Sequence, residues 1–172
     1  MWFLLLGLAL FGVACIPRRA LVIRTDFTAD DPVLARLLKE CAQEWADAGV
    51  TVASIVTVNE NVAGAMPVLR APRDDLWINC HAKQGPAYRG DGCTAIEDGR
   101  WDAIYIPNDL QDENRIRAVL MHELAHVFAC TKLHLDPELV GIMHPNANSE
   151  TITDADMAFM SKYTEVDDGG EQ

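Results

Sequence analysis

Basic side chains are scarce in this chain. Its 172 residues include 14 lysines and arginines against 26 aspartates and glutamates, a formal net charge of −12. The basic doublet Arg18-Arg19 stands near the N-terminus. Because a nucleic-acid-binding protein neutralises phosphates with clustered basic groups, this composition argues against nucleic acid as a partner.

Long apolar runs are also missing. The uncharged stretch before Arg18 is shorter than the roughly twenty residues that a bilayer span needs, but it suits the apolar region of a secretory signal. It ends in small residues and Cys15, a candidate for lipidation, and an uncleaved N-terminal anchor is the alternative. We therefore exclude residues 1–19 from the fold and expect an extracytoplasmic protein, secreted or anchored to a membrane as a lipoprotein.

Internal repeats and low-complexity blocks are absent from the sequence. Almost half of the residues are apolar and about a quarter are charged, as in ordinary globular proteins. The length suits one domain. We expect a single domain at 20–164 and an acidic tail at 165–172.

Four cysteines remain if Cys15 is lipidated or removed, an even number that predicts two disulfides outside the cytoplasm. Of the three pairings, Cys80 with Cys93 is our first choice, because the two bracket a loop that contains glycine and proline. Cys41 would then pair with Cys130. The alternative is that Cys41 is a buried thiol on an apolar helix face.

The pattern of apolar residues predicts an α+β fold. Strands are expected at 20–27, 51–59, 75–82 and 101–107. Loops are expected at 60–74, where a short strand near 67–69 is an option, and at 83–99. Helices are expected from Pro32 to about Gly49, from about 110 to about 130, and to about 163. This order suggests a mixed, mostly parallel twisted sheet of about four to five strands, with a backing helix, a histidine-bearing helix and a C-terminal helix.

Three helix starts carry capping signals. Asp30 or Asp31 precedes Pro32. Asn108 or Asp109 is expected to cap the second helix, and Thr153 the third.

The segment HELAH at 122–126 is a zinc-binding pattern. On a helix, His122 and His126 lie one turn apart on the same face, so their imidazoles can share one metal ion. Glu123 is rotated by about 100° around the axis, toward a water on that metal, whose proton it can accept as a general base. The surrounding helix is nearly apolar all round, which does not suit two unpartnered histidines.

A third ligand is less evident from the sequence. The candidates that follow the motif are Cys130, His134, Asp136, Glu138 and His144. An unbroken helix would carry His134 about 12 Å along the axis from His126, so the helix must end soon after Phe128.

Glycine is missing where such a turn usually has one. In three-histidine sites, a glycine three residues after the second histidine takes the left-handed conformation at low cost. Here that residue is Ala129. We predict that two additional residues before His134 provide a wider turn, with a disulfide at Cys130 to hold it.

The motifs together resemble the metzincin zinc endopeptidases, and within them the matrix-metalloproteinase-like branch. The resemblance covers roughly 101–163 and lies in HELAH, His134, Asp136-Pro137, Met143-His144-Pro145 and the segment ITDADMAFMSKY. It implies that His122, His126 and His134 are zinc ligands, that Glu123 is the general base, and that Met143 is the apolar floor beneath the metal. Read without the resemblance, Met143 is an ordinary core methionine.

The leading functional hypothesis is therefore a zinc-dependent endopeptidase acting on a protein or peptide substrate, with one catalytic Zn²⁺. The alternative is a non-catalytic, zinc-stabilised surface or binding protein that keeps the fold. Glu123 favours catalysis, because a structural site has no use for a base beside an open coordination position. A peptidase with two histidines and a glutamate would need Glu150 as its third ligand.

Overall fold

A computed structural model of the chain describes residues 22–25, 31–50, 55–56, 65–76, 91–97, 100–146 and 149–164. The predicted signal at 1–19 and the tail at 165–172 lie outside these ranges, as do Cys15 and Cys80. Among the described helices, none is both long and apolar enough to span a bilayer.

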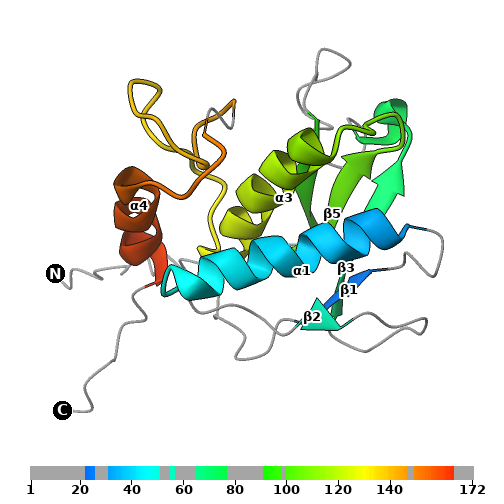
Figure 1. The fold of residues 1–172 in the computed structure, drawn as a ribbon, viewed down its shortest axis with the longest axis horizontal. Coiled ribbons are helices and arrows are strands. Elements are labelled where there is room, and N and C mark those ends of the chain that lie inside the picture. Colours follow the sequence, from blue (N-terminus) through cyan, green and yellow to red (C-terminus); the bar gives the residue numbers. More distant parts are fainter. Residues whose placement is uncertain are drawn as a thin grey trace, which may run out of the picture.

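A five-stranded mixed sheet forms one layer of the fold (Figure 1). Its strands run in the order β2-β1-β3-β5-β4. Four of them are parallel, and β4 pairs antiparallel with β5 at one edge. The bounds are β1 Val22–Thr25, β2 Ile55–Val56, β3 Ala65–Ala71, β4 Cys93–Glu97 and β5 Arg100–Pro107. The α+β class and a mixed sheet are thus confirmed.

Two long helices pack side by side against the sheet (Figure 1). They are α1, Pro32–Asp47, and α3, Glu113–Phe128, while α4, Asp154–Thr164, contacts α3. The inner face of α1 repeats at helical spacing and buries Leu34, Leu38 and Trp45. Trp45 also donates its indole N–H to the Met121 carbonyl at 3.1 Å, which fixes α1 against the middle of α3.

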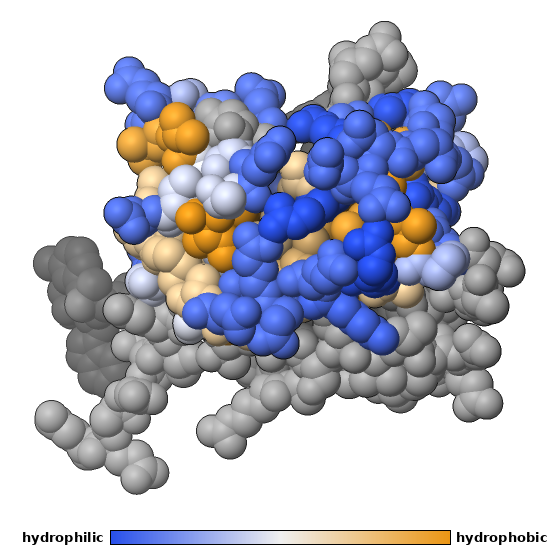
Figure 2. All heavy atoms as spheres, in the orientation of Figure 1, coloured by the Kyte–Doolittle hydropathy of each residue, from blue (hydrophilic) through white to orange (hydrophobic). Residues whose placement is uncertain are grey.

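Hydrophilic residues cover most of the described surface on the α1 side, and apolar residues appear there as separated patches (Figure 2). The outer face of α1 contributes the Arg36–Glu40 pair, which is exposed and contributes little to stability. The fold therefore depends on the core beneath α1 and α3.

Three sequence predictions about strands differ from the structure. The segment 60–74 was predicted as a loop with an optional short strand near 67–69. It contains β3, a strand of seven residues in the middle of the sheet, so the optional strand is confirmed and is longer than predicted. Gly64 and Pro67 interrupt the apolar alternation of Met66 and Val68 in the sequence. The predicted loop at 83–99 contains β4 at 93–97. The predicted strand at 75–82 begins with residues that belong to a short helical stretch at 73–76, and the rest of it lies outside the described residues.

The predicted helix boundaries agree with the structure, but one of the predicted N-caps does not. Asp31 caps α1, because its carboxylate accepts the Leu34 N–H at 2.9 Å. The cap of α3 is Asp112 and not Asn108 or Asp109, since Asp112 accepts the Arg115 N–H. The two residues 108 and 109 instead form a turn after β5.

The predicted pairing of Cys41 with Cys130 was wrong. Cys41 is a free, buried thiol on the inner face of α1, and its sulfur lies 3.7 Å from the Arg117 carbonyl of α3. It is held inside the interface between the two helices, which confirms the alternative reading. Cys93 and Cys130 are both disulfide-bonded. The predicted pairing of Cys93 with Cys80 stays a prediction, because Cys80 lies outside the described residues.

Candidate metal centre

The second half of α3 is buried almost completely. Residues 118–127 are all buried, and this run includes His122, Glu123 and His126, each no more than 7% exposed. Such burial follows from the contacts of α3 with α1, with α4 and with strands β4 and β5. The three polar side chains are therefore removed from bulk water and need internal partners.

Helix α3 ends at Phe128, as the sequence predicted. Ala129 is still right-handed with φ −83°. The left-handed residue is Cys130, with φ 49°, one position later than the glycine of a tight three-histidine turn. A non-glycine residue in this conformation is uncommon, and here the residue is also tied down by a disulfide.

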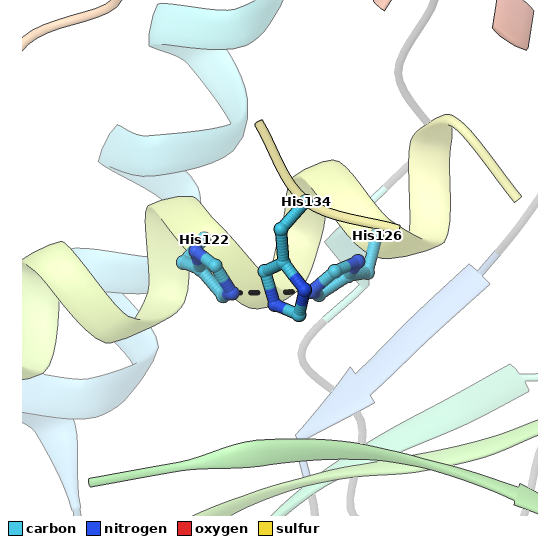
Figure 3. Close-up of side chains that lie close together, drawn as sticks. All are labelled: His122, His126 and His134. Carbon is cyan, nitrogen blue, oxygen red and sulfur yellow. Dashed lines mark hydrogen bonds between the residues drawn. The ribbon is translucent and has the colours of Figure 1, made fainter. Parts of the chain in front are cut away.

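This wider turn brings a third histidine to the other two (Figure 3). The ring centroids of His122, His126 and His134 lie 4.7, 5.1 and 4.8 Å apart, nearly an equilateral triangle. One nitrogen from each ring lies within 4.8 Å of the others, so the three could hold a metal ion. Within the described ranges, the group does not include the other candidates, which were Cys130, Asp136, Glu138, His144 and Glu150.

The outer nitrogens of the two helical histidines reveal their protonation. His122 Nδ1 lies 2.7 Å from the Ile142 carbonyl, and His126 Nδ1 lies 2.8 Å from the Thr131 carbonyl. Because a carbonyl only accepts, each Nδ1 carries the hydrogen and donates it. In the neutral rings, each Nε2 atom then carries no hydrogen and has a free lone pair.

These two Nε2 atoms face each other at 3.1 Å. Two lone pairs at this distance repel each other unless a cation lies near both of them. Two nitrogens on one tetrahedral zinc at about 2.0–2.1 Å would be about 3.4 Å apart. The geometry therefore fits a metal ion, with the backbone carbonyls as the outer contacts that orient its ligands.

The site electrostatics keep all three rings neutral. Burial lowers the pKa of His126 to about 3 and that of His134 to about 4, and it also lowers the pKa of His122. The neighbouring histidines lower the values for His126 and His134 further. Neutral imidazole is the form that binds metal, so the site is ready for it at neutral pH.

A buried carboxylate on α4 holds the segment behind His122. Asp156 has no exposed surface, and its two oxygens accept the backbone N–H groups of Ile142 and Met143 at 3.0 and 2.8 Å. Asp156 also accepts hydrogen bonds from the backbone N–H and the hydroxyl of Thr153. The Thr153 hydroxyl oxygen in turn accepts the Asp156 N–H in the first turn of α4, so Thr153 caps this helix, as the sequence predicted. Gly141 allows this close approach, since a Cβ there would lie 2.6 Å from an Asp156 oxygen. The Ile142 carbonyl that orients His122 is therefore set by Asp156.

Glu123 follows His122 on α3, and its side chain is buried. Burial raises the pKa of its carboxyl to about 7, and hydrogen bonds from the side chain and backbone of Thr94 pull the pKa in the opposite direction. The Thr94 hydroxyl lies 2.7 Å from Glu123 Oε2. Sequence reasoning missed Thr94, because it assigned 83–99 to a loop. The alternation of Cys93, Thr94 and Ala95 was the signal that could have indicated a strand.

No protein-family model matches this chain, and no curated protein is significantly similar to it.

Proposed function

We propose that this protein is an extracytoplasmic zinc-dependent endopeptidase. In this proposal His122, His126 and His134 bind one Zn²⁺, and Glu123 is the general base for hydrolysis of a peptide bond. The observation that carries it is the pair of unprotonated Nε2 atoms, 3.1 Å apart, on a helix that also presents a buried carboxyl.

The number of ligands supports a catalytic metal. Structural zinc sites are usually closed by four protein ligands, whereas catalytic sites keep three and leave one position open. The described residues supply three, and His134 is the exposed member of the group. A closed structural site would need a fourth ligand that the described part of the chain does not supply.

The chain's own residues suit the chemistry of hydrolysis. A bound zinc ion would polarise the scissile carbonyl and lower the pKa of a water toward 7. Glu123, whose own pKa is raised to about 7, can accept the proton of the attacking water near neutral pH and return it to the leaving amine.

The order of elements supports the metzincin-like reading within this proposal. A histidine-bearing helix is followed by a third histidine, by Met143, which is fully buried, and by a C-terminal helix. The Leu135 N–H donates to the Met143 carbonyl at 2.9 Å, which ties the segment of His134 to that of Met143. We further propose that the N-terminal segment, or a lipidated Cys15, directs the protein to the outside of the membrane.

Glu123 provides the direct test. Wild type and Glu123→Ala would be compared for metal content and for cleavage of a mixed peptide library. We expect equal zinc content and a loss of cleavage of at least about 10²-fold, because the variant loses the proton acceptor and no ligand. Equal cleavage rates would refute the role of Glu123. Bound zinc without any cleavage by wild type would favour the alternative, a zinc-stabilised binding protein.

A further inference from the structure

The general base of the proposed reaction is hydrogen-bonded by a residue of the sheet. Thr94 lies on β4, 29 positions before Glu123, and its hydroxyl lies 2.7 Å from Glu123 Oε2. The same hydroxyl lies 3.4 Å from the Glu123 carbonyl, a weaker alternative acceptor. A hydroxyl has one hydrogen to donate, so the nearer carboxylate oxygen receives it.

The close approach of β4 to α3 explains how the short Thr94 side chain contacts Glu123. Gly92 and Thr94 point to the same face of the extended chain, since side chains alternate along a strand. Val119 and Glu123 lie one turn apart on α3. A Cβ at Gly92 would overlap the Val119 side chain. The missing side chain at Gly92 therefore lets β4 come close, and one strand step later Thr94 meets Glu123.

The contact matters because little else restrains this carboxylate. A glutamate has three side-chain torsions, and a general base must point one oxygen at the proton that it takes. In the part of the chain that the structure describes, the side chain of Glu123 has no cationic partner. The hydrogen bonds to its carboxylate come from the hydroxyl and the backbone of Thr94, and of these two the hydroxyl is the one that a substitution can remove. With Oε2 held, Oε1 is left to accept a proton from water.

We infer that Thr94 is a positioning residue for the general base: its hydroxyl holds Glu123 by Oε2 so that Oε1 faces the attacking water. This inference rests on the proposed peptidase function. Thr94 itself touches neither the metal ligands nor, in this account, the substrate. Its effect is therefore on the chemical step and not on metal binding or substrate affinity.

The test compares substitutions at Thr94 in the full-length, zinc-loaded protein. Thr94→Val keeps the shape and suits a strand but lacks the hydroxyl, and Thr94→Ser keeps the hydroxyl. We expect Thr94→Val to lower kcat about 10- to 100-fold, the usual range for a contact one shell from the reacting groups, with KM and zinc content close to wild type. Thr94→Ser should restore kcat to within about threefold. Thr151→Val, the same change at an exposed threonine, is the matched control and should leave kcat unchanged.

A second arm separates positioning from general damage. If Thr94 acts through Glu123, then Thr94→Val should cost nothing further in a Glu123→Gln background. Unfolding midpoints would show that each variant folds, and Thr94→Ala would replace Thr94→Val if the valine variant does not. An unchanged kcat in Thr94→Val, an equal loss in Thr94→Ser, or an additional loss on the Glu123→Gln background would overturn the inference. Absence of cleavage by zinc-loaded wild type would instead overturn the peptidase proposal, and this inference with it.

Discussion

The two halves of the histidine site are built in different ways. His122, Glu123 and His126 lie on α3, a regular helix that packs against α1 and the sheet. His134 and Met143 lie on the segment 130–146, which has no regular secondary structure. That segment is held by a small set of polar contacts, above all those of Asp156 and the Leu135–Met143 backbone bond.

This difference indicates which half of the site tolerates substitutions. Many apolar side chains hold α3, so the loss of any one of them leaves the others in place. The irregular half depends on buried hydrogen bonds, and removing one partner leaves the other unsatisfied. Small polar changes in 130–146 and α4 should therefore damage the site more than equally small changes elsewhere.

The largest effect is expected at the ligands. His126→Ala and His134→Ala should each lower zinc affinity by more than about 100-fold, although one ring is buried and the other exposed, because each loses a direct metal bond. Asp136→Ala, Glu138→Ala and His144→Ala should leave affinity largely intact, and competition with a chromogenic chelator would rank all five variants. If Asp136→Ala were the most damaging, the irregular half would supply a different ligand.

Asp156 is expected to have the next largest effect. Asp156→Ala leaves the buried N–H groups of Ile142 and Met143 without an acceptor, so it should cost about 3 kcal/mol of unfolding free energy. Zinc affinity should fall about 10- to 100-fold, since the Ile142 carbonyl orients His122.

Asp154→Ala, at an exposed position in the first turn of the same helix, is the control for Asp156. It should cost at most about 1 kcal/mol, the usual size of a helix-dipole contribution, and leave zinc affinity unchanged. Denaturant unfolding and chelator competition measure both quantities. Similar losses in the two variants would show that α4 as a whole, and not the carboxylate clamp, supports the site.

Acid should act on the histidines of the metal-free protein. The unfolded chain protonates them near their ordinary pKa of 6.5, whereas burial lowers the folded-state pKa of His126 to about 3 and of His134 to about 4. The unfolded state then binds more protons, so the free energy of unfolding should fall as pH drops from about 6.5 toward about 4. Glu123 has the opposite effect, because its carboxyl has a higher pKa in the folded state, about 7, than in the unfolded chain. It is one group against three histidines, so the net slope should follow the histidines.

Unfolding curves at several pH values, for wild type and for the double variant His126→Ala/His134→Ala, would measure this slope. The double variant lacks two of the three groups and should lose most of the histidine contribution. Identical slopes in the two proteins would show that the acid sensitivity comes from other groups.

The smallest effect is expected at the end of α1. Gly49 has φ +95°, and a Cβ there would meet nothing within 4 Å, so Gly49→Ala costs only backbone strain, about 1 kcal/mol. Zinc affinity should not change, because a Cβ at Gly49 would contact nothing and α1 supplies none of the three histidines. A large drop in affinity, measured by the same chelator competition, would mean that the helical half is less robust than its packing indicates.

The two halves also differ in how far the sequence predicts them. HELAH, on an apolar helix, indicates a metal site with its general base, because helical periodicity places side chains at known angles. The end of α3 and the wider turn were predicted from the distance to His134. The position of the turn at Cys130 was not, because a left-handed cysteine has no sequence signal of its own.

The missed features share a physical cause. Pro67 lies within β3 and glycines precede β4, and both residue types mark loops in most sequences. Both strands are stabilised by pairing with β5, a contact between distant segments that a local pattern does not contain. Thr94 and Asp156 owe their roles to the same kind of contact, so neither was identified as part of the site.

X-ray absorption at the zinc edge of the zinc-loaded, full-length protein tests the central claim most directly. We expect one zinc per chain with nitrogen or oxygen neighbours at about 2.0–2.1 Å and the outer-shell scattering of three imidazoles, reduced to two in His134→Ala. A sulfur neighbour at about 2.3 Å, the same number of imidazoles in His134→Ala, or no bound zinc would contradict it.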